Sequence, residues 1–186
     1  MLIGICGKSG CGKSTLAKQI VQYASVPAEH LDMDKIGHRV LLLPEVKSAL
    51  AEAFGTDVLT ENEVDRKKLS KIVFCSASDM EVLTRITWKH MEKTIDEYLR
   101  NNSEKLIVMD WLLLPKTKYF AMCEQTILLD IPYAVREQRA MRRDNISAEQ
   151  FKRRDAAAIA YQYEMFDIVL DECNAPQLQE VVRRYA

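Results

Sequence analysis

The stretch "LIGICGKSGCGKST", residues 2–15, decides the fold of this chain. It begins with a short apolar run, Leu2–Cys6, of the kind that forms a buried parallel strand. The pattern G-x-x-x-x-G-K-S/T follows at once and is met by Gly7, Gly12, Lys13 and Ser14. Apolar residues then recur at helical spacing. A glycine-rich pattern between a strand and a helix predicts a phosphate-binding loop.

Each residue type in this loop has a physical purpose. Glycine permits positive φ and close approach of the backbone, so that successive N–H groups can point at phosphate oxygens. The helix that begins near Lys13 adds the positive end of its dipole. We expect Lys13 to reach the β- and γ-phosphates and the Ser14 hydroxyl to bind Mg²⁺. The loop predicts a site for a nucleoside triphosphate with Mg²⁺, formed by Gly7, Ser9, Gly10, Cys11, Gly12, Lys13, Ser14 and Thr15.

Further short segments, most of them apolar, predict the rest of a sheet. They alternate with segments of helical periodicity, which is typical of a parallel sheet covered by helices on both faces. Besides residues 2–6, strands are expected at residues 28–32, 106–109, 126–129 and 166–170. The sequence therefore predicts an α/β fold of one domain, residues 1–186, with a parallel five-stranded sheet flanked by helices.

The helical segments carry signals for their ends. Pro44 interrupts a helical stretch at residues 34–54, and Pro132 opens an arginine-rich helix. Ser147, with Gln150 three residues on, predicts a capping box at the start of the next helix. Further helices are expected at residues 65–74, 78–99 and 177–185. The largely helical stretch from about 35 to 102 is long for a simple crossover, so we expect a helical subdomain there.

Composition limits the kind of protein. The 186 residues include 26 basic and 27 acidic ones, and a net charge of −1 argues against a broad nucleic-acid surface. No apolar run approaches the roughly 20 residues of a membrane span, and no signal peptide is recognisable. Five scattered cysteines indicate reduced thiols in a cytoplasmic protein: Cys6, Cys11, Cys75, Cys123 and Cys173. The sequence leaves the oligomeric state open.

An acidic pair follows the second predicted strand. Asp32 and Asp34 straddle Met33, so in an extended strand their side chains would share one face. The carboxyl ends of parallel strands border the ligand crevice. A carboxylate there can accept a proton from an acceptor hydroxyl or align that hydroxyl for phosphoryl transfer. The alternative for Asp34 is a helix N-cap.

Arginines gather in "REQRAMRRD", residues 136–144, and in "FKRRD", residues 151–155. Arg139 and Arg143 are four residues apart and so lie on one helical face. Positive charge aimed at a moving phosphoryl group can raise the rate by roughly 10³ to 10⁵. The alternative is a solvated basic helix, which we favour for residues 142 and 153.

These features favour a small-molecule kinase that uses ATP. The chain has no NKxD motif, which argues against a GTPase, and its arginine-rich part suits a lid that closes over ATP. Asp110 follows the strand at residues 106–109 and is similar to a Walker B aspartate. It would bind Mg²⁺ through water or cap the next segment.

Together the residues resemble the dephospho-coenzyme A (dephospho-CoA) kinase family, which catalyses the last step of coenzyme A synthesis. The likeness spans most of the chain. It is carried by "LIGICGKSGCGKSTLAKQI" (residues 2–20), "LDMDKIGHRVL" (31–41), "FGTDVLTENEVDRKKLSKIVF" (54–74) and "QRAMRRDNISAEQFKRR" (138–154). The resemblance implies a P-loop kinase fold with a core, an acceptor subdomain at about 35–102 and a lid at about 132–160.

The resemblance also implies roles for single residues. Asp34 would be the base for the ribose 3′-hydroxyl of dephospho-CoA, with Asp32 beside the substrate. Arg139 and Arg143 would be lid residues near the phosphates, with Arg139 on the nucleotide and Arg143 in catalysis. Arg66 and Arg154 would bind substrate.

Two departures from the family keep other functions open. The long helix has Trp88-Lys89 where the family usually has His-Pro, and no glutamate follows the run at residues 111–115. One alternative is therefore a kinase for a nucleoside, a nucleotide or another small alcohol. The other is a regulatory nucleotide-binding protein without transfer, against which the acidic pair argues. Cys11 lies at a helix N-terminus, where a thiolate is favoured, so its oxidation would block nucleotide binding; a small tolerated residue is the favoured alternative.

Overall fold

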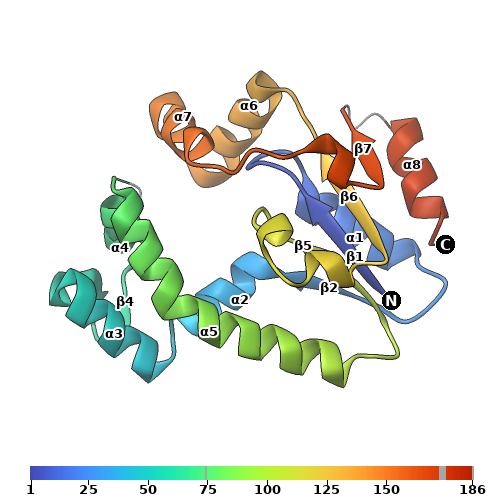
Figure 1. Cartoon of the computed structure of the whole chain (residues 1–186). Helices are drawn as coiled ribbons and strands as arrows, with labels where there is room; N and C mark the ends of the chain where they lie inside the picture. Colours follow the sequence, from blue (N-terminus) through green and yellow to red (C-terminus); the bar gives the residue numbers. More distant parts are fainter. Residues whose placement is uncertain (74, 172–174, 186) are drawn as a thin grey trace. The chain divides into compact units, whose positions relative to one another are not determined.

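The computed structural model describes residues 1–73, 75–171 and 175–185 (Figure 1). Phe74, the end of a predicted helix, and Cys173 lie outside these residues. The chain divides into two compact units. The core unit contains residues 1–33 and 102–186, and the helical unit contains residues 34–101.

The core unit is built on one parallel sheet. Its strands are β1 (Leu2–Cys6), β2 (Ala28–Asp32), β5 (Leu106–Asp110), β6 (Gln125–Leu129) and β7 (Ile168–Leu170), in the order β2-β5-β1-β6-β7. The five predicted parallel strands are thus confirmed, although β7 begins two residues later than expected. β1 is central, with β5 on one side and β6 on the other. The sheet order therefore places the end of β1 at the switch point where such folds bind ligands.

The two faces of β1 are covered differently. Ile3 and Ile5 face an apolar cluster with residues of α1 (Lys13–Tyr23) and α8 (Ala175–Arg183). Gly4 faces the opposite side, where the segment at residues 111–123 packs with its short helices η2 (Leu114–Lys116) and η3 (Phe120–Met122). A Cβ atom on Gly4 would lie only 2.6 Å from the Leu114 side chain and 2.8 Å from Cys123 Sγ. A glycine in the central strand therefore lets this segment lie directly on the sheet.

The arginine-rich part of the core unit is a pair of helices. α6 (Tyr133–Asp144) begins after Pro132, as predicted, and α7 (Ala148–Ala156) follows it. The predicted capping box is confirmed: the Gln150 amide donates to Ser147 Oγ over 3.2 Å, and the Ser147 amide donates to Gln150 Oε1 over 2.8 Å. A short helix, η4 (Tyr163–Met165), then leads into β7.

The helical unit has a core of its own. It consists of α2 (Met33–Val40, whose first residue belongs to the core unit), α3 (Pro44–Phe54), α4 (Arg66–Val73) and α5 (Ala77–Asn101). A short helix, η1 (Thr56–Val58), precedes a small hairpin of β3 (Leu59–Thr60) and β4 (Glu63–Val64). The buried side chains of the helical unit include Val46, Leu50, Val58, Leu69 and Val73. The predicted break at Pro44 is confirmed because proline occupies the first turn of α3.

Candidate nucleotide-binding site

The backbone of the predicted phosphate-binding loop has the conformation that its glycines suggest. Gly7, Gly10 and Gly12 have φ values of 143°, 83° and 100°, which side-chain-bearing residues rarely adopt. A Cβ atom on Gly7 would lie 2.7 Å from the Leu129 carbonyl oxygen. A Cβ atom on Gly10 would collide with the backbone of Arg136. The loop therefore needs glycine at position 12 for its conformation and at positions 7 and 10 also for lack of space.

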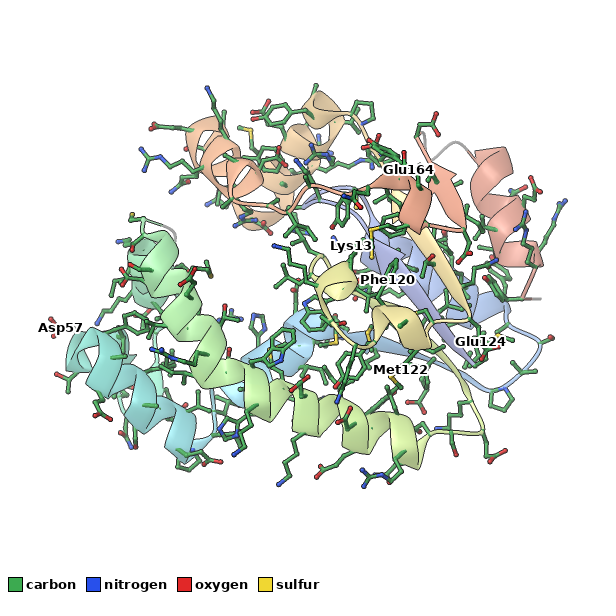
Figure 2. The ribbon with its side chains drawn as sticks, in the orientation of Figure 1. Lys13, Asp57, Phe120, Met122, Glu124 and Glu164 are labelled. Carbon is green, nitrogen blue, oxygen red and sulfur yellow. The ribbon has the colours of Figure 1, made fainter. Side chains whose placement is uncertain are left out.

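Lys13 and Ser14 extend from the start of α1 at the end of β1, where Figure 2 labels Lys13. Lys13 Nζ donates a hydrogen bond of 2.9 Å to the Gly7 carbonyl, so the ammonium group lies over the loop. Ser14 Oγ donates a hydrogen bond of 2.5 Å to Asp110 Oδ2. The structure thus brings together the hydroxyl that was predicted to bind Mg²⁺ and a carboxylate for which Mg²⁺ binding through water was one of two alternatives.

Oxygen ligands of this kind suit Mg²⁺, which usually keeps several waters and takes few ligands from the protein. Within the described residues, no group of three or more His, Cys, Asp or Glu side chains could hold a metal ion by itself. A hydroxyl and one carboxylate beside a phosphate-binding loop fit an ion that shares its coordination with phosphates.

Asp110 has two neighbours on β2. The parallel register pairs Asp110 with Asp32, so these two carboxylates end adjacent strands. His30 lies on the same face, and its Nε2 atom is 3.1 Å from Asp110 Oδ1. That contact is at ion-pair distance without hydrogen-bond geometry, and the described residues give Nε2 no other partner. The sequence alone gives no sign of this contact, because only the pairing of β2 with β5 brings His30 beside Asp110.

The expected geometry of the acidic pair is wrong. β2 ends at Asp32 and α2 begins at Met33, so Asp34 lies in the first turn of a helix. Successive helical residues turn by about 100°, and the two carboxylates do not share the face of an extended strand. Asp34 is exposed and belongs to the helical unit, whereas Asp32 belongs to the core unit. Its role as a base stays a prediction.

Arg66, the other predicted residue of the helical unit, begins α4 and is exposed. Its guanidinium contacts the imidazole of His38 on α2. Asp65 caps α4, because its carboxylate accepts the amides of Lys67 and Lys68 at 2.9 and 3.1 Å. These bonds, led by the one from Lys68, lower the pKa of Asp65. The cap fixes where the helix starts and hence where Arg66 leaves it.

The arginines of the α6–α7 pair are not equivalent. Arg143 makes a two-pronged contact with Asp144, with distances of 2.7 and 3.0 Å, and Arg154 also binds this carboxylate. Hydrogen bonds, first that from Arg143, hold the pKa of Asp144 at about 2. Arg139 is exposed and has no hydrogen bond or ion pair to any described residue. The structure thus links two of the predicted arginines through one carboxylate.

Two further residues reach the loop, and the sequence analysis gave neither of them a role in the site. Arg136 is 6% exposed, and its Nη1 atom is 2.5 Å from Asp155 Oδ1 and 3.5 Å from the Ser9 carbonyl oxygen. Tyr161 accepts the Gly7 amide at 3.2 Å and donates to the Leu112 carbonyl at 2.9 Å. Burial raises the pKa of Tyr161. A cavity of about 250 Å³ opens beside them, lined by Lys8, Leu129, Asp130, Arg136, Ala160, Tyr161 and Tyr163.

The comparison with known proteins decides what this arrangement belongs to. A family model described as dephospho-CoA kinase matches residues 1–176. The chain belongs to the dephospho-CoA kinase family.

A curated relative agrees with this assignment, and two solved structures share the fold. The dephospho-CoA kinase of Aquifex aeolicus (strain VF5) is 31% identical over 187 residues, which cover 98% of this chain and 92% of that protein. A structure of TT1252 from Thermus thermophilus has a TM-score of 0.80 at 22% identity and covers 99% of this chain and 95% of its own. A dephospho-CoA kinase structure from Campylobacter jejuni has a TM-score of 0.61 at 21% identity, with coverage of 100% and 97%. The predicted P-loop kinase fold is confirmed.

Membership of the dephospho-CoA kinase family places the chain among kinases, and two further features bear on the earlier expectations. None of the helices that the structure describes has the length and apolar character needed to span a membrane.

Cys6, Cys11, Cys75 and Cys123 are free thiols. Burial raises the pKa of Cys6 and raises that of Cys123 to about 12. Cys11 is fully buried, with Sγ 4.0 Å from Lys13 Nζ, and its redox role stays a prediction.

Proposed function

We propose that this chain transfers the γ-phosphoryl group of ATP to the ribose 3′-hydroxyl of dephospho-CoA, giving coenzyme A and ADP. The observation that carries the proposal is the contact of Ser14 with Asp110 beside a glycine loop that Lys13 overlies. Family membership supports the choice of acceptor.

On the nucleotide side, the amides of the loop would hold phosphate oxygens, together with the positive end of α1. Lys13 would neutralise charge on the β- and γ-phosphates. The Ser14 hydroxyl would bind Mg²⁺ directly, and Asp110 would orient that hydroxyl or an intervening water. Mg²⁺, when bound, stabilises the negative charge that develops on the transferred group. Thr15 and the backbone of residues 7–12 complete this side.

On the acceptor side, Asp34 would accept the proton of the 3′-hydroxyl as its oxygen bonds to the γ-phosphorus. The bond from that phosphorus to the bridging oxygen breaks, and ADP leaves. Asp32 and Arg66 would bind and align the acceptor. The α6–α7 pair would act as the lid, with Arg139 and Arg143 on the phosphates and Arg154 on the substrate. Because Asp144 binds both Arg143 and Arg154, it would hold these two side chains in a fixed relation.

A different acceptor is the second candidate, and one observation favours it. Trp88 and Lys89, which replace the His-Pro of the family, line a surface hollow of about 440 Å³ on α5. Its other lining residues are Met80, Glu81, Thr84, Arg85 and Glu92. The Trp88 indole ring and the Met80 side chain in this hollow can contact an aromatic or aliphatic group of an acceptor other than dephospho-CoA.

The test is ADP release from ATP and Mg²⁺ with and without dephospho-CoA, followed by the mass of the product. We expect ADP release to depend on the acceptor and the acceptor to gain one phosphate. Lys13→Ala should abolish transfer, and Asp34→Asn should lower kcat far more than ATP affinity. If Asp34→Asn turns over as fast as the unchanged protein, Asp34 is not the general base.

The same assay separates the alternatives. If a nucleoside, a nucleotide or another alcohol stimulates ADP release and dephospho-CoA does not, that compound class is the acceptor. ATP binding without transfer to any of them would leave a regulatory nucleotide-binding protein.

A further inference from the structure

The base of α6 carries a buried arginine that the proposed chemistry does not use. Arg136 Nε donates a hydrogen bond of 2.8 Å to the Ile131 carbonyl, and Nη1 binds Asp155 on α7 at 2.5 Å. The rings of Tyr133 and Phe151 lie 5.7 and 5.9 Å from its guanidinium carbon. Buried charges persist where they are paired and hydrogen-bonded. Arg136 therefore joins the start of α6 to the end of α7.

The phosphate-binding loop touches the same residue. Arg136 Nη1 is 3.5 Å from the Ser9 carbonyl oxygen, and the Arg136 backbone fills the space where a side chain on Gly10 would lie. From the loop, Lys8 Nζ lies 3.8 Å from Asp155 Oδ2. The Asp155 side chain is 13% exposed. It lies between two cations, Arg136 from α6 and Lys8 from the loop.

The spacing along α6 gives this contact a consequence. Arg139 and Arg143 follow Arg136 by three and seven residues, so all three lie on one face of the helix. A helix that is fixed at its first turn cannot rotate about its axis without breaking that attachment. The direction in which Arg139 leaves α6 is therefore set at Arg136.

We propose that Arg136, held by Asp155, is a positioning residue that fixes α6 against the phosphate-binding loop and so aims Arg139 and Arg143 at the phosphates. The inference rests on the proposed function, in which those two arginines act on ATP. Arg136 acts through them and through the Ser9 carbonyl. The planar fork of arginine reaches several acceptors at once, which the single ammonium of lysine cannot do.

A double-mutant cycle tests the coupling. Arg139→Ala is measured in the unchanged protein and in Asp155→Asn. In the unchanged protein we expect kcat to fall on the order of 10²-fold, as for the loss of one donor to a developing charge. In Asp155→Asn, kcat is already reduced on the order of 10-fold or more, because small misplacements are costly in rate. Removing Arg139 should then lower kcat only a few-fold further, because its side chain is no longer aimed at the phosphates.

The controls separate positioning from a general loss of stability. Glu149→Gln removes an exposed ion pair with Arg153 on the same helix, and it should leave kcat and the Arg139→Ala factor unchanged. Arg136→Lys keeps the charge but not the fork, and it should restore part of the rate relative to Arg136→Gln. Thermal unfolding selects variants that are folded at the assay temperature. If Asp155→Asn fails this criterion, the cycle is run in Arg136→Lys.

An equal Arg139→Ala factor in both backgrounds would overturn the inference, because independent effects multiply. So would full kcat in Asp155→Asn. The same four proteins are then compared by their Kd for a non-hydrolysable ATP analogue, measured without any acceptor. Coupling in that Kd supports the positioning role even if dephospho-CoA is not phosphorylated, and its absence overturns the role, so the two proposals fail separately.

Discussion

Gly10 and Gly12 form a matched pair for testing how the phosphate-binding loop is built. Both have positive φ, 83° and 100°, so an alanine at either site costs roughly 1–2 kcal/mol for its left-handed backbone. The two sites differ in their surroundings: a Cβ atom on Gly10 would lie 2.9 Å from the Arg136 carbonyl carbon and 3.0 Å from its Cα atom, whereas one on Gly12 would have no atom of the described residues within 4 Å apart from its neighbours in the chain. Forcing atoms into a packed site adds typically about 1–3 kcal/mol.

We therefore expect Gly12→Ala to lower the free energy of unfolding by about 1–2 kcal/mol and Gly10→Ala by about 2–5 kcal/mol. In a chain of this size, 1 kcal/mol shifts the melting temperature by about 2–4 °C. The melting temperature of Gly10→Ala should thus lie about 2–12 °C below that of Gly12→Ala. Thermal unfolding followed by circular dichroism measures both under the same conditions. Equal melting temperatures, or the reverse order, would refute the packing of Arg136 against the loop.

Three further predictions concern side chains of the core unit. Asp110→Asn should raise the Mg²⁺ concentration for half-maximal activity by about 10-fold or more, since the hydrogen bond from Ser14 loses its anionic acceptor; an unchanged Mg²⁺ titration would contradict this. The pKa of Asp144 is about 2 in the folded chain, below the ordinary value of 3.8 for an aspartate, so its stabilising contribution is present above pH 4 and is lost as the pH falls toward 2. Unfolding measured across this range should show a smaller acid dependence in Asp144→Asn. Tyr161→Phe leaves the amide of Gly7 and a carbonyl without their partner and should cost about 1–3 kcal/mol in urea unfolding; an unchanged midpoint would show that water replaces the hydroxyl.

Local pattern was enough to predict the sheet and the loop. β1 has the predicted bounds because its short apolar run ends at a glycine, and β2, which contains Glu29 and His30, also has the predicted bounds. The capping box at Ser147 was predictable because its partner lies three residues away. These features depend only on residues that are close along the chain, so a single sequence is enough to predict them.

The sequence failed where two residues were assigned to one element or where partners are distant. The predicted strand ends at residue 32 and the predicted helix begins at 34, yet the acidic pair was treated as one extended strand, so the faces of Asp32 and Asp34 were misjudged. The β3–β4 hairpin turns at Glu61 and Asn62, both with positive φ, and only the asparagine is typical of such turns. The contact of Arg136 with Asp155 depends on how two helices pack, which residue spacing does not specify.

Gly4 has a consequence for motion. The segment at residues 111–123 has only two short helices and would pass for a mobile loop, yet its ends are tied to β1: the Trp111 amide donates to the Ile5 carbonyl at 3.0 Å, and the Glu124 amide donates to the Leu2 carbonyl at 2.9 Å. Between these bonds, Leu114 and Tyr119 are completely buried. Because opening this segment would strip apolar surface from the central strand, its amides should be protected from hydrogen exchange nearly as well as those of the sheet. Irregular backbone is here part of the packed core next to Asp110, and it should open no more readily than the sheet itself.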